Sequence, residues 1–516
     1  MATASTAVRD PAGRVSELAR AANPLWTALF ILAAVVAFRA TGTVDPDVSW
    51  QLWIAHQLNG GVRLYRDIVE ANPPLWFWMA MPVDRLVSLI HLRSDHLLIL
   101  MIGCSAALSL VGTNRILESV SRPSRTWLLC FAALVLVAMP WAQFGQREQI
   151  ALIATLPYAA LIGARRTGRS FPSGFAFAVG ACAALGFALK PYFLLVPLSL
   201  DLWLLAEQGR KWRPFRAETI ALATVGLLDA VALAVFARAY VSIELPLLLL
   251  AYEVTGAERM LDLFQPAVLT GLVTLLLLLA HGRAVRSERS GFAGAMAVAA
   301  TAFATAYFIQ AKGWSYQAIP LAGCAGIALA AVLTADTKPR VVLLAAPALL
   351  VLPFWIAAKQ AVYEPAFKDV RSGIEGLRPG DSVGFLATDP AVAWSVTLQN
   401  GLRYPSRYYG FWMMRAIVNN EHAARRDPRL TDLGRNVVEQ TVEDFRCQQP
   451  KRVLVARPTP AAARQGEFDI LPFFLRDPNF AELLSHYRPV WRSGTLERFD
   501  QVSPLAPART CILRAS

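Results

Sequence analysis

Eleven long apolar runs constrain this chain more than any other feature of its sequence. A helix needs about 20 apolar residues to cross the hydrocarbon core of a bilayer, and backbone groups inside lipid must bond within that helix. The runs lie at residues 22–41, 95–113, 126–143, 148–164, 173–189, 191–206, 217–238, 264–281, 291–311, 316–334 and 340–358. Because 55% of the residues are hydrophobic and only 17% are charged, a single water-soluble domain is excluded. The sequence predicts an all-α polytopic membrane bundle of about eleven transmembrane helices.

Positive charge is concentrated in alternate loops of this predicted bundle. The net charge is +13, and membrane proteins keep their Lys and Arg residues mainly on the cytoplasmic side. Residues 74–90 are also apolar, but Pro82, Asp84 and Arg85 interrupt them. If this segment lies in the membrane interface instead of crossing, all of the basic loops fall on one side. These loops carry Arg9, Arg14 and Arg20; Arg115, Arg122 and Arg125; Arg165, Arg166 and Arg169; Arg210, Lys211, Arg213 and Arg216; Arg283, Arg286 and Arg289; and Lys338 and Arg340.

This pattern predicts the domain organisation. We expect a cytoplasmic N-terminal segment at residues 1–21 and a transmembrane domain at residues 22–358, with a long first outer loop at residues 41–94. Residues 359–516 contain no further spanning run, and we expect them to form a soluble domain on the extracytoplasmic, periplasmic side. The chain is thus predicted to be a multi-pass protein of the cytoplasmic (inner) membrane. Nucleic acid is not a predicted partner, because no soluble segment combines basic clusters with aromatic residues.

The C-terminal segment has the alternating pattern of a small α/β or α+β domain. Strand-like runs at Ser382–Leu386, Arg452–Val455 and Cys511–Leu513 alternate with helical stretches such as Asn436–Phe445. Cys447 and Cys511 are its only cysteines, and in an oxidising compartment we expect them to form a disulfide. Several aromatic and basic side chains are candidates for a sugar-stacking surface, although aromatic residues are more often part of a core. They are Trp394, Arg403, Tyr404, Arg407, Tyr408, Tyr409 and Trp412.

The first outer loop carries an unusual number of functional groups. Asp45 and Asp47 follow the first span directly, where an acidic group is costly unless it is hydrated, paired or used. The next residues predict an aromatic interfacial helix with Trp50, Trp53 and His56. Membrane anchoring is enough to account for the tryptophans, but it does not account for the two aspartates.

Three further outer turns carry charged side chains. Arg147 and Glu148 follow a tight turn, Lys190 precedes a proline between two spans, and Lys312 precedes Gly313. Each has a structural alternative: Arg147 and Glu148 could be an ion pair that closes the turn, and a Lys at a helix end commonly reaches for the interface. The functional hypothesis is that these groups share one site, with Lys190 binding a lipid phosphate as a point charge.

The membrane limits the chemistry available to such a site. Nucleotide sugars are cytoplasmic, so an outward-facing transferase needs a donor delivered by lipid, and a polyprenyl-phosphate sugar meets that need. Its phosphate is the leaving group and needs Lys or Arg, while the acceptor hydroxyl needs a carboxylate as general base.

The order of Asp47, Gly61, Tyr65-Arg66-Asp67 and Asn72-Pro73-Pro74-Leu75 resembles the start of GT-C glycosyltransferases. It is most like the bacterial lipid-A-core and aminoarabinose transferase type, with a more distant relation to protein O-mannosyltransferases. Glu148, Lys190-Pro191, and Lys312 with Trp314 and Tyr316 match later outer turns of that family, but Gln317 stands where many relatives have His. The resemblance covers about residues 22–358 and does not extend to the tail.

The resemblance implies roles for individual residues. Asp47 is the general base, with Asp45 in reserve because the Asp-Pro-Asp register is ambiguous by two residues. The reaction is a single displacement that inverts the anomeric centre, and Glu148 orients the acceptor or binds a metal. The expected contacts to the donor phosphate and the substrates are Lys190, Arg147, Lys312, Tyr65, Asp67 and Tyr316. Some members use a divalent cation and others use none; Asp45, Asp47 and Glu148 are the candidate oxygen ligands for Mg²⁺ or Mn²⁺.

Two other classes of function stay open at this point. One is a transporter or flippase of lipid-linked saccharide, and the other is a non-catalytic protein of the same fold in envelope assembly. P-loop, zincin and thioredoxin chemistry have no motif in the sequence. Changing Asp47 and Asp45 to Asn separates the classes, because only a transferase loses its product while still inserting into the membrane. The sugar and the glycan or glycolipid acceptor are not encoded in any motif.

Overall fold

The computed structural model describes residues 23–42, 44–90, 92–252, 262–281, 288–334, 368–389, 392–458, 468–493, 495–507, 511 and 513. The contacts between its Cα atoms divide the chain into two compact units. We call the first the helical unit (residues 1–42, 99–227 and 257–356) and the second the mixed unit (residues 43–98, 228–256 and 357–516). The predicted boundary at residues 358/359, the N-terminal segment 1–21 and the eleventh run lie outside the described residues.

Helices form at the first ten predicted spans. They are α2 (Pro24–Arg39), α5 (Ser94–Ile116), α6 (Arg122–Val137), α7 (Arg147–Arg166), α8 (Ser173–Ala188), α9 (Leu195–Gln208), α10 (Ala217–Phe236), α12 (Pro266–His281), α13 (Glu288–Gln310) and α14 (Ile319–Leu333). Four segments are long and apolar enough to cross a membrane, namely Ser94–Ile116, Ala217–Phe236, Gly291–Gln310 and Ser315–Leu333. The helices therefore suit a polytopic membrane protein, while the count of eleven spans and the assignment of sides stay predictions.

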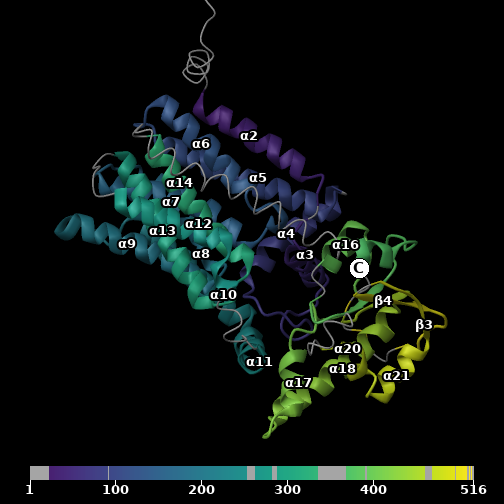
Figure 1. Cartoon of the computed structure of the whole chain (residues 1–516). Helices are drawn as coiled ribbons and strands as arrows, with labels where there is room; N and C mark the ends of the chain where they lie inside the picture. Colours follow the sequence, from purple (N-terminus) through teal and green to yellow (C-terminus); the bar gives the residue numbers. More distant parts are fainter. Residues whose placement is uncertain are drawn as a thin grey trace, which may run out of the picture. The chain divides into compact units, whose positions relative to one another are not determined.

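Within the helical unit, α13 packs against α14, α7 and α9, and α2 packs against α6 (Figure 1). Glycines allow the closest of these approaches. A Cβ atom on Gly163 of α7 would lie 2.6 Å from the carbonyl oxygen of Gly291 in α13, so no larger residue fits between the two backbones. Small residues at helix contacts are the usual means of close packing between membrane helices. Short 3-10 turns connect the helices: η1 (Trp141–Gln143), η2 (Pro191–Leu194), η3 (Gly209–Lys211), η6 (Asp262–Phe264) and η7 (Ser315–Ala318).

The mixed unit contains a four-stranded sheet with the order β1-β2-β4-β3. Its strands are β1 (Val383–Leu386), β2 (Arg452–Ala456), β3 (Tyr487–Arg492) and β4 (Leu496–Gln501). β1 runs parallel to β2, with Val383 opposite Arg452, and the other two pairings are antiparallel. The strand prediction is confirmed for β1 and β2 and wrong for Cys511–Leu513, whose described residues, Cys511 and Leu513, are not in a strand.

Helices surround the sheet within the mixed unit. They are α16 (Val392–Gln399), α17 (Met414–His422), α18 (Pro428–Gln448), α20 (Ile470–Phe474) and α21 (Pro478–Ser485). The ring of Phe445 in α18 would lie only 2.7 Å from a Cβ atom on Gly384, so this glycine lets α18 pack directly on β1. Helix α18 covers the predicted stretch Asn436–Phe445 and extends beyond it at both ends.

The first outer loop packs into the same unit as the tail. It forms α3 (Pro46–Asn59) and α4 (Leu75–Ile90), and the chain after α10 adds the π-helical turn η4 (Tyr240–Glu244) and α11 (Leu245–Ala251). The Ser395 hydroxyl donates to the carbonyl of Val44 over 2.9 Å, and the Val69 amide donates to the carbonyl of Arg407 over 3.0 Å. Trp50 is only 2% exposed in this packing, so its ring packs within the unit, and the interfacial position of α3 stays a prediction.

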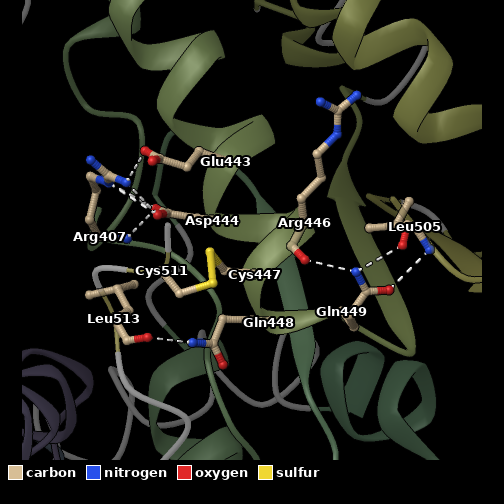
Figure 2. Close-up of a disulfide and its surroundings, with 10 residues drawn as sticks. All are labelled: Arg407, Glu443, Asp444, Arg446, Cys447, Gln448, Gln449, Leu505, Cys511 and Leu513. Atoms are coloured by element: carbon tan, nitrogen blue, oxygen red, sulfur yellow. Dashed lines mark hydrogen bonds and ion pairs between the residues drawn. A yellow bond between two sulfur atoms is a disulfide. The ribbon is translucent and has the colours of Figure 1, made fainter. Parts of the chain in front are cut away.

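Cys447 and Cys511 are joined by a disulfide in the structure, with their Cα atoms 5.5 Å apart (Figure 2). The side-chain amide of Gln448 donates to the carbonyl of Leu513 over 2.9 Å beside it. On the same helix, Asp444 accepts hydrogen bonds from Nε and Nη2 of the guanidinium and from the backbone amide of Arg407 (Figure 2). These contacts tie both the chain end and the segment around Arg407 to α18.

Candidate active site

The helical unit contains a buried cluster of charged side chains, which we call the basic cluster: Arg147, Glu148, Lys190 and Lys312. The Nζ atom of Lys190 lies 2.6 Å from Oε1 of Glu148, and the two residues are 8% and 1% exposed. Arg147 is 2% exposed, and its Nε and Nη1 atoms have no hydrogen-bond partner among the described residues. The sequence hypothesis that Glu148 and Lys190 share one site agrees with this geometry, whereas an Arg147–Glu148 ion pair is absent from the described contacts.

Local backbone features place these side chains at helix ends. The turn before α7 is held by Gln149, whose Oε1 accepts from the amide of Gly145 over 2.7 Å and whose Nε2 donates to the carbonyl of Leu136 over 2.9 Å. Gly145 has a φ of +94°, a conformation that glycine adopts without strain. A hydrogen bond from Gln143 to the hydroxyl of Ser315 joins this turn to η7, which follows Lys312.

The electrostatic environment of Lys312 is unfavourable for its charge. Burial, together with the positive charges of Lys190 and Arg147, lowers the pKa of Lys312 to about 8. Lys312 lies between the two candidate spans that end at Gln310 and begin at Ser315. Two aromatic rings accompany the cluster: Nζ of Lys190 lies 5.2 Å from the ring centre of Tyr316, and Nζ of Lys312 lies 4.6 Å from that of Trp314.

The basic cluster is suited to hold an anion. The cluster combines three cationic side chains with one carboxylate, which is paired with Lys190, so protonated Lys312 leaves an excess of positive charge there. Buried charge without compensation is costly, and a bound phosphate offers compensation through charge-assisted hydrogen bonds. Its oxygens can accept from the unpartnered nitrogen atoms of Arg147.

Sequence reasoning missed Arg39, a further cation beside the turn before α7. Arg39 ends α2 and is 6% exposed. Its guanidinium carbon lies 5.7 Å from the ring centre of Trp141 and 5.5 Å from that of Phe144. An arginine at the end of a span is usually an interfacial anchor, so its sequence position alone gave no signal of this packing.

The two aspartates of the first outer loop lie in the mixed unit and have different environments. Asp45 is the N-cap of α3, and its Oδ1 accepts from the backbone amide of Asp47 over 2.9 Å. This arrangement is a standard use of Asp at a helix start. Asp47 lies in the first turn of α3, directly after the cap, so its side chain is not the one that caps the helix.

Tyr409 of the tail is a partner of Asp47 that the sequence did not single out for this role. Burial raises the pKa of Tyr409 well above its ordinary value, and the carboxylate of Asp47, to which it is hydrogen-bonded, raises it further. The tyrosine hydroxyl and the Asp47 carboxylate therefore lie close together. This contact connects the tail directly to the candidate base.

An aromatic cluster lies next to this pair within the mixed unit. Its rings are those of Trp50, Trp53, Trp394, Tyr404 and Tyr409, with centres 4.0 to 6.4 Å apart for each contacting pair. Trp50, Trp394 and Tyr404 are buried, so the core interpretation holds for them and a surface for sugar stacking does not. Nε1 of Trp50 donates to Oε2 of Glu70 over 2.5 Å.

Tyr65 and Asp67 are engaged within the first outer loop. Tyr65 has a φ of +66°, and its hydroxyl donates to the carbonyl of Asn72 over 2.6 Å. Asp67 accepts from the guanidinium of Arg63 over 2.8 and 2.9 Å, and these bonds lower the pKa of its carboxyl. In the described structure both residues shape the loop, and substrate contact by either one stays a prediction.

A divalent cation stays a prediction of the sequence. In the part of the chain that the structure describes, no three His, Cys, Asp or Glu side chains lie close enough together to hold a metal ion. The predicted oxygen site of Asp45, Asp47 and Glu148 is not among such groups.

Helices of membrane-spanning length, joined to a small unit with a mixed sheet, define a polytopic integral membrane protein. The fold is similar to that of a solved structure, the crystal structure of ArnT from Cupriavidus metallidurans bound to undecaprenyl phosphate. The match has a TM-score of 0.52 at 13% sequence identity and covers 95% of this chain and 98% of that one. The GT-C resemblance seen in the sequence is therefore confirmed at the level of the fold. No protein-family model matches the sequence, and no curated protein matches it either.

Proposed function

We propose that the chain is a GT-C-type glycosyltransferase that moves a sugar from a polyprenyl-phosphate donor to an envelope glycan or glycolipid acceptor. The observation that carries this proposal is the basic cluster, in which Glu148 pairs with Lys190, and Arg147 and Lys312 add two further positive charges. The basic cluster is buried at helix ends, and such a site suits a phosphate that is attached to a membrane lipid. The similar ArnT structure is bound to undecaprenyl phosphate, which supports the same chemistry here.

The reaction is a single displacement at the anomeric carbon. Asp47 takes the proton of the acceptor hydroxyl, the acceptor oxygen bonds to the anomeric carbon, and the bond from that carbon to the phosphate oxygen breaks. The electron pair leaves with the phosphate, and Lys190, Lys312 and Arg147 stabilise the charge that develops there. Polyprenyl phosphate is the leaving product, and the anomeric configuration inverts.

The residues divide the work by their chemistry. Arg147 presents a planar guanidinium that can bind two phosphate oxygens at once, while the two lysines act as point charges. Glu148 holds Lys190 in place through the 2.6 Å ion pair. The hydroxyl of Tyr409 orients Asp47, and Asp45 caps α3 so that Asp47 stays in the first helical turn. The acceptor, the sugar and the extracytoplasmic location belong to the proposal.

A deletion strain tests the proposal. Its glycolipid and polysaccharide profile should lack one sugar modification, and the wild-type gene should restore it. Asp47→Asn should insert into the membrane at the wild-type level and restore nothing, whereas Asp45→Asn should keep partial activity, because Asn also caps helices. An unchanged profile with Asp47→Asn favours a flippase or an assembly protein instead.

A further inference from the structure

An open apolar groove lies between α8, α9 and α10 of the helical unit. Its volume is about 350 Å³, roughly ten times the volume of a water molecule in the liquid. Apolar side chains line most of it, including Phe187, Leu198 and Leu222, and its polar end is formed by Asp201 and Thr219. A groove of this shape on the outside of a helix bundle faces lipid chains rather than water.

Gly226 keeps the α10 side of the groove open. A Cβ atom on this glycine would meet no other atom within 4 Å. The α10 window from Ala217 to Phe236 is only 6% buried, the least of the four candidate spans. The groove is therefore accessible along α10 without any movement of the helices.

The charges at the polar end compensate one another. Arg216 pairs with Asp201 and Glu218, and Nε of Arg165 lies 3.1 Å from Oε1 of Glu218. Two arginines thus neutralise two carboxylates, and neither carboxylate is left to repel an anion. The hydroxyl of Thr219 is buried at the groove and has no hydrogen-bond partner among the described residues.

The loop between α9 and α10 adds uncompensated positive charge at this end. Arg210, Lys211 and Arg213 are exposed, and none of them forms an ion pair with the described part of the chain. Phe215 is 86% exposed in the same loop, which suits a side chain that enters a lipid surface. The three cations suit the phosphate of an anionic lipid, and the apolar groove beside them suits one of its acyl chains.

We propose that the groove and the loop together bind one anionic phospholipid, with an acyl chain between α8, α9 and α10 and the phosphate against Arg210, Lys211 and Arg213. Basic pockets between membrane helices are suited to such head groups. The phosphate end of this site is distinct from the basic cluster, because α9 starts five residues after Lys190 and runs for 14 residues to Gln208, about 21 Å, before the loop begins. The other end of the groove includes Ala188 and Leu194, which flank Lys190 in the sequence, so the assignment to a bilayer lipid rests on the charges of the loop.

Native mass spectrometry of the full-length protein tests the site. The probes are dioleoylphosphatidylglycerol and, as the neutral counterpart, dioleoylphosphatidylcholine, each added to delipidated protein in detergent micelles. We expect the wild type to retain one phosphatidylglycerol in preference to phosphatidylcholine. The triple variant Arg210→Gln, Lys211→Gln, Arg213→Gln should weaken retention roughly a hundredfold, since each basic residue near a lipid surface contributes a factor of about five.

The groove itself is tested by a matched pair at one position. Gly226→Leu places a branched side chain in the open space and should weaken phosphatidylglycerol binding roughly tenfold through lost chain contacts. Gly226→Ala adds only a methyl group and should bind as the wild type does. Arg122→Gln, an exposed arginine at the start of α6, controls for a general loss of positive charge.

Three outcomes would overturn the proposal. Equal retention of both lipids means that only general bilayer lipid is held. If the triple variant loses phosphatidylglycerol binding but Gly226→Leu does not, the basic loop binds the lipid by charge alone and the groove takes no part. Displacement of phosphatidylglycerol by stoichiometric undecaprenyl phosphate assigns the groove to the donor. Because the Gly226 pair leaves every charge in place, the test stands even if the triple variant does not fold.

Discussion

Glu148→Gln is the substitution whose effect the basic cluster determines most sharply. The carboxylate is buried, and its Oε1 lies 2.6 Å from Nζ of Lys190. Removing one partner of a buried ion pair costs about 3–5 kcal/mol, since the other charge stays buried without compensation. Because Glu148 is the one carboxylate among three cations in the cluster, we expect the free energy of unfolding to fall by an amount in this range.

Two comparison variants make this expectation specific. Lys190→Met should cost less, about 1–3 kcal/mol, because Glu148 still has Lys312 and Arg147 as nearby cations. Glu207 forms an ion pair with Arg166 over 3.0 Å in the same unit, but its side chain is 37% exposed. Glu207→Gln should therefore change the free energy of unfolding by less than about 1 kcal/mol.

Equilibrium unfolding of the purified protein in mixed micelles, followed by tryptophan fluorescence, measures these differences. Undecaprenyl phosphate should stabilise Glu148→Gln more than the wild type, because the added phosphate supplies the missing negative charge. The reasoning is refuted if Glu148→Gln and Glu207→Gln have the same free energy of unfolding and if undecaprenyl phosphate stabilises Glu148→Gln no more than the wild type. The basic cluster would then not be a site that needs an anion.

Three further predictions concern pH and the disulfide. Because the pKa of Lys312 is lowered to about 8, the affinity for radiolabelled undecaprenyl phosphate should fall between pH 7 and 9 as this side chain loses its proton. Lys312→Arg should remove this pH dependence. A wild-type affinity that does not change with pH would contradict a role for Lys312 in binding the phosphate. The hydrogen bond to Asp84 raises the pKa of His56 above 6.5, so the stability from this pair is complete below pH 6.5 and is lost as the pH rises through the raised pKa. NMR of labelled histidine should show the pKa returning toward 6.5 in Asp84→Asn, and no change would exclude the pair. Replacing Cys447 and Cys511 with Ser should lower the free energy of unfolding of the mixed unit by about 4 kcal/mol, given the 64-residue separation. The intact mass of the wild type should rise by two hydrogen atoms when the disulfide is reduced, and two free thiols in untreated protein would contradict this.

The helical part of the fold was predictable because each span carries its own signal. A run of apolar residues is long enough by itself to indicate a helix, and helices such as α7 and α13 begin or end within a few residues of the predicted limits. The candidate cations Lys190 and Lys312 were also predictable from a local pattern, because each is a charged residue between two apolar runs. That Lys190 binds Glu148 follows from packing of α7 and α8, which no local pattern encodes.

The mixed unit was predictable only where its strands are buried. β1 has four buried residues and reads as an apolar run, which is typical of a strand in a parallel pair. β3 and β4 are partly exposed and carry charged residues, so no apolar run marked them. The packing of α3 against the tail depends on contacts such as Ser395 to Val44, which are separated by 351 residues in the sequence. For the same reason the role of Tyr409 at Asp47 could not be predicted.

Donor turnover by the purified protein tests the central proposal most directly. Membranes of the deletion strain should accumulate the sugar-loaded polyprenyl phosphate and the unmodified acceptor, and they serve as the substrate for added protein. Wild-type protein should consume the loaded lipid and release polyprenyl phosphate in equal amount to the glycosylated product, while Asp47→Asn should do neither at the same protein level. Release of polyprenyl phosphate by Asp47→Asn at the wild-type rate, or no turnover by the wild type, would contradict the account.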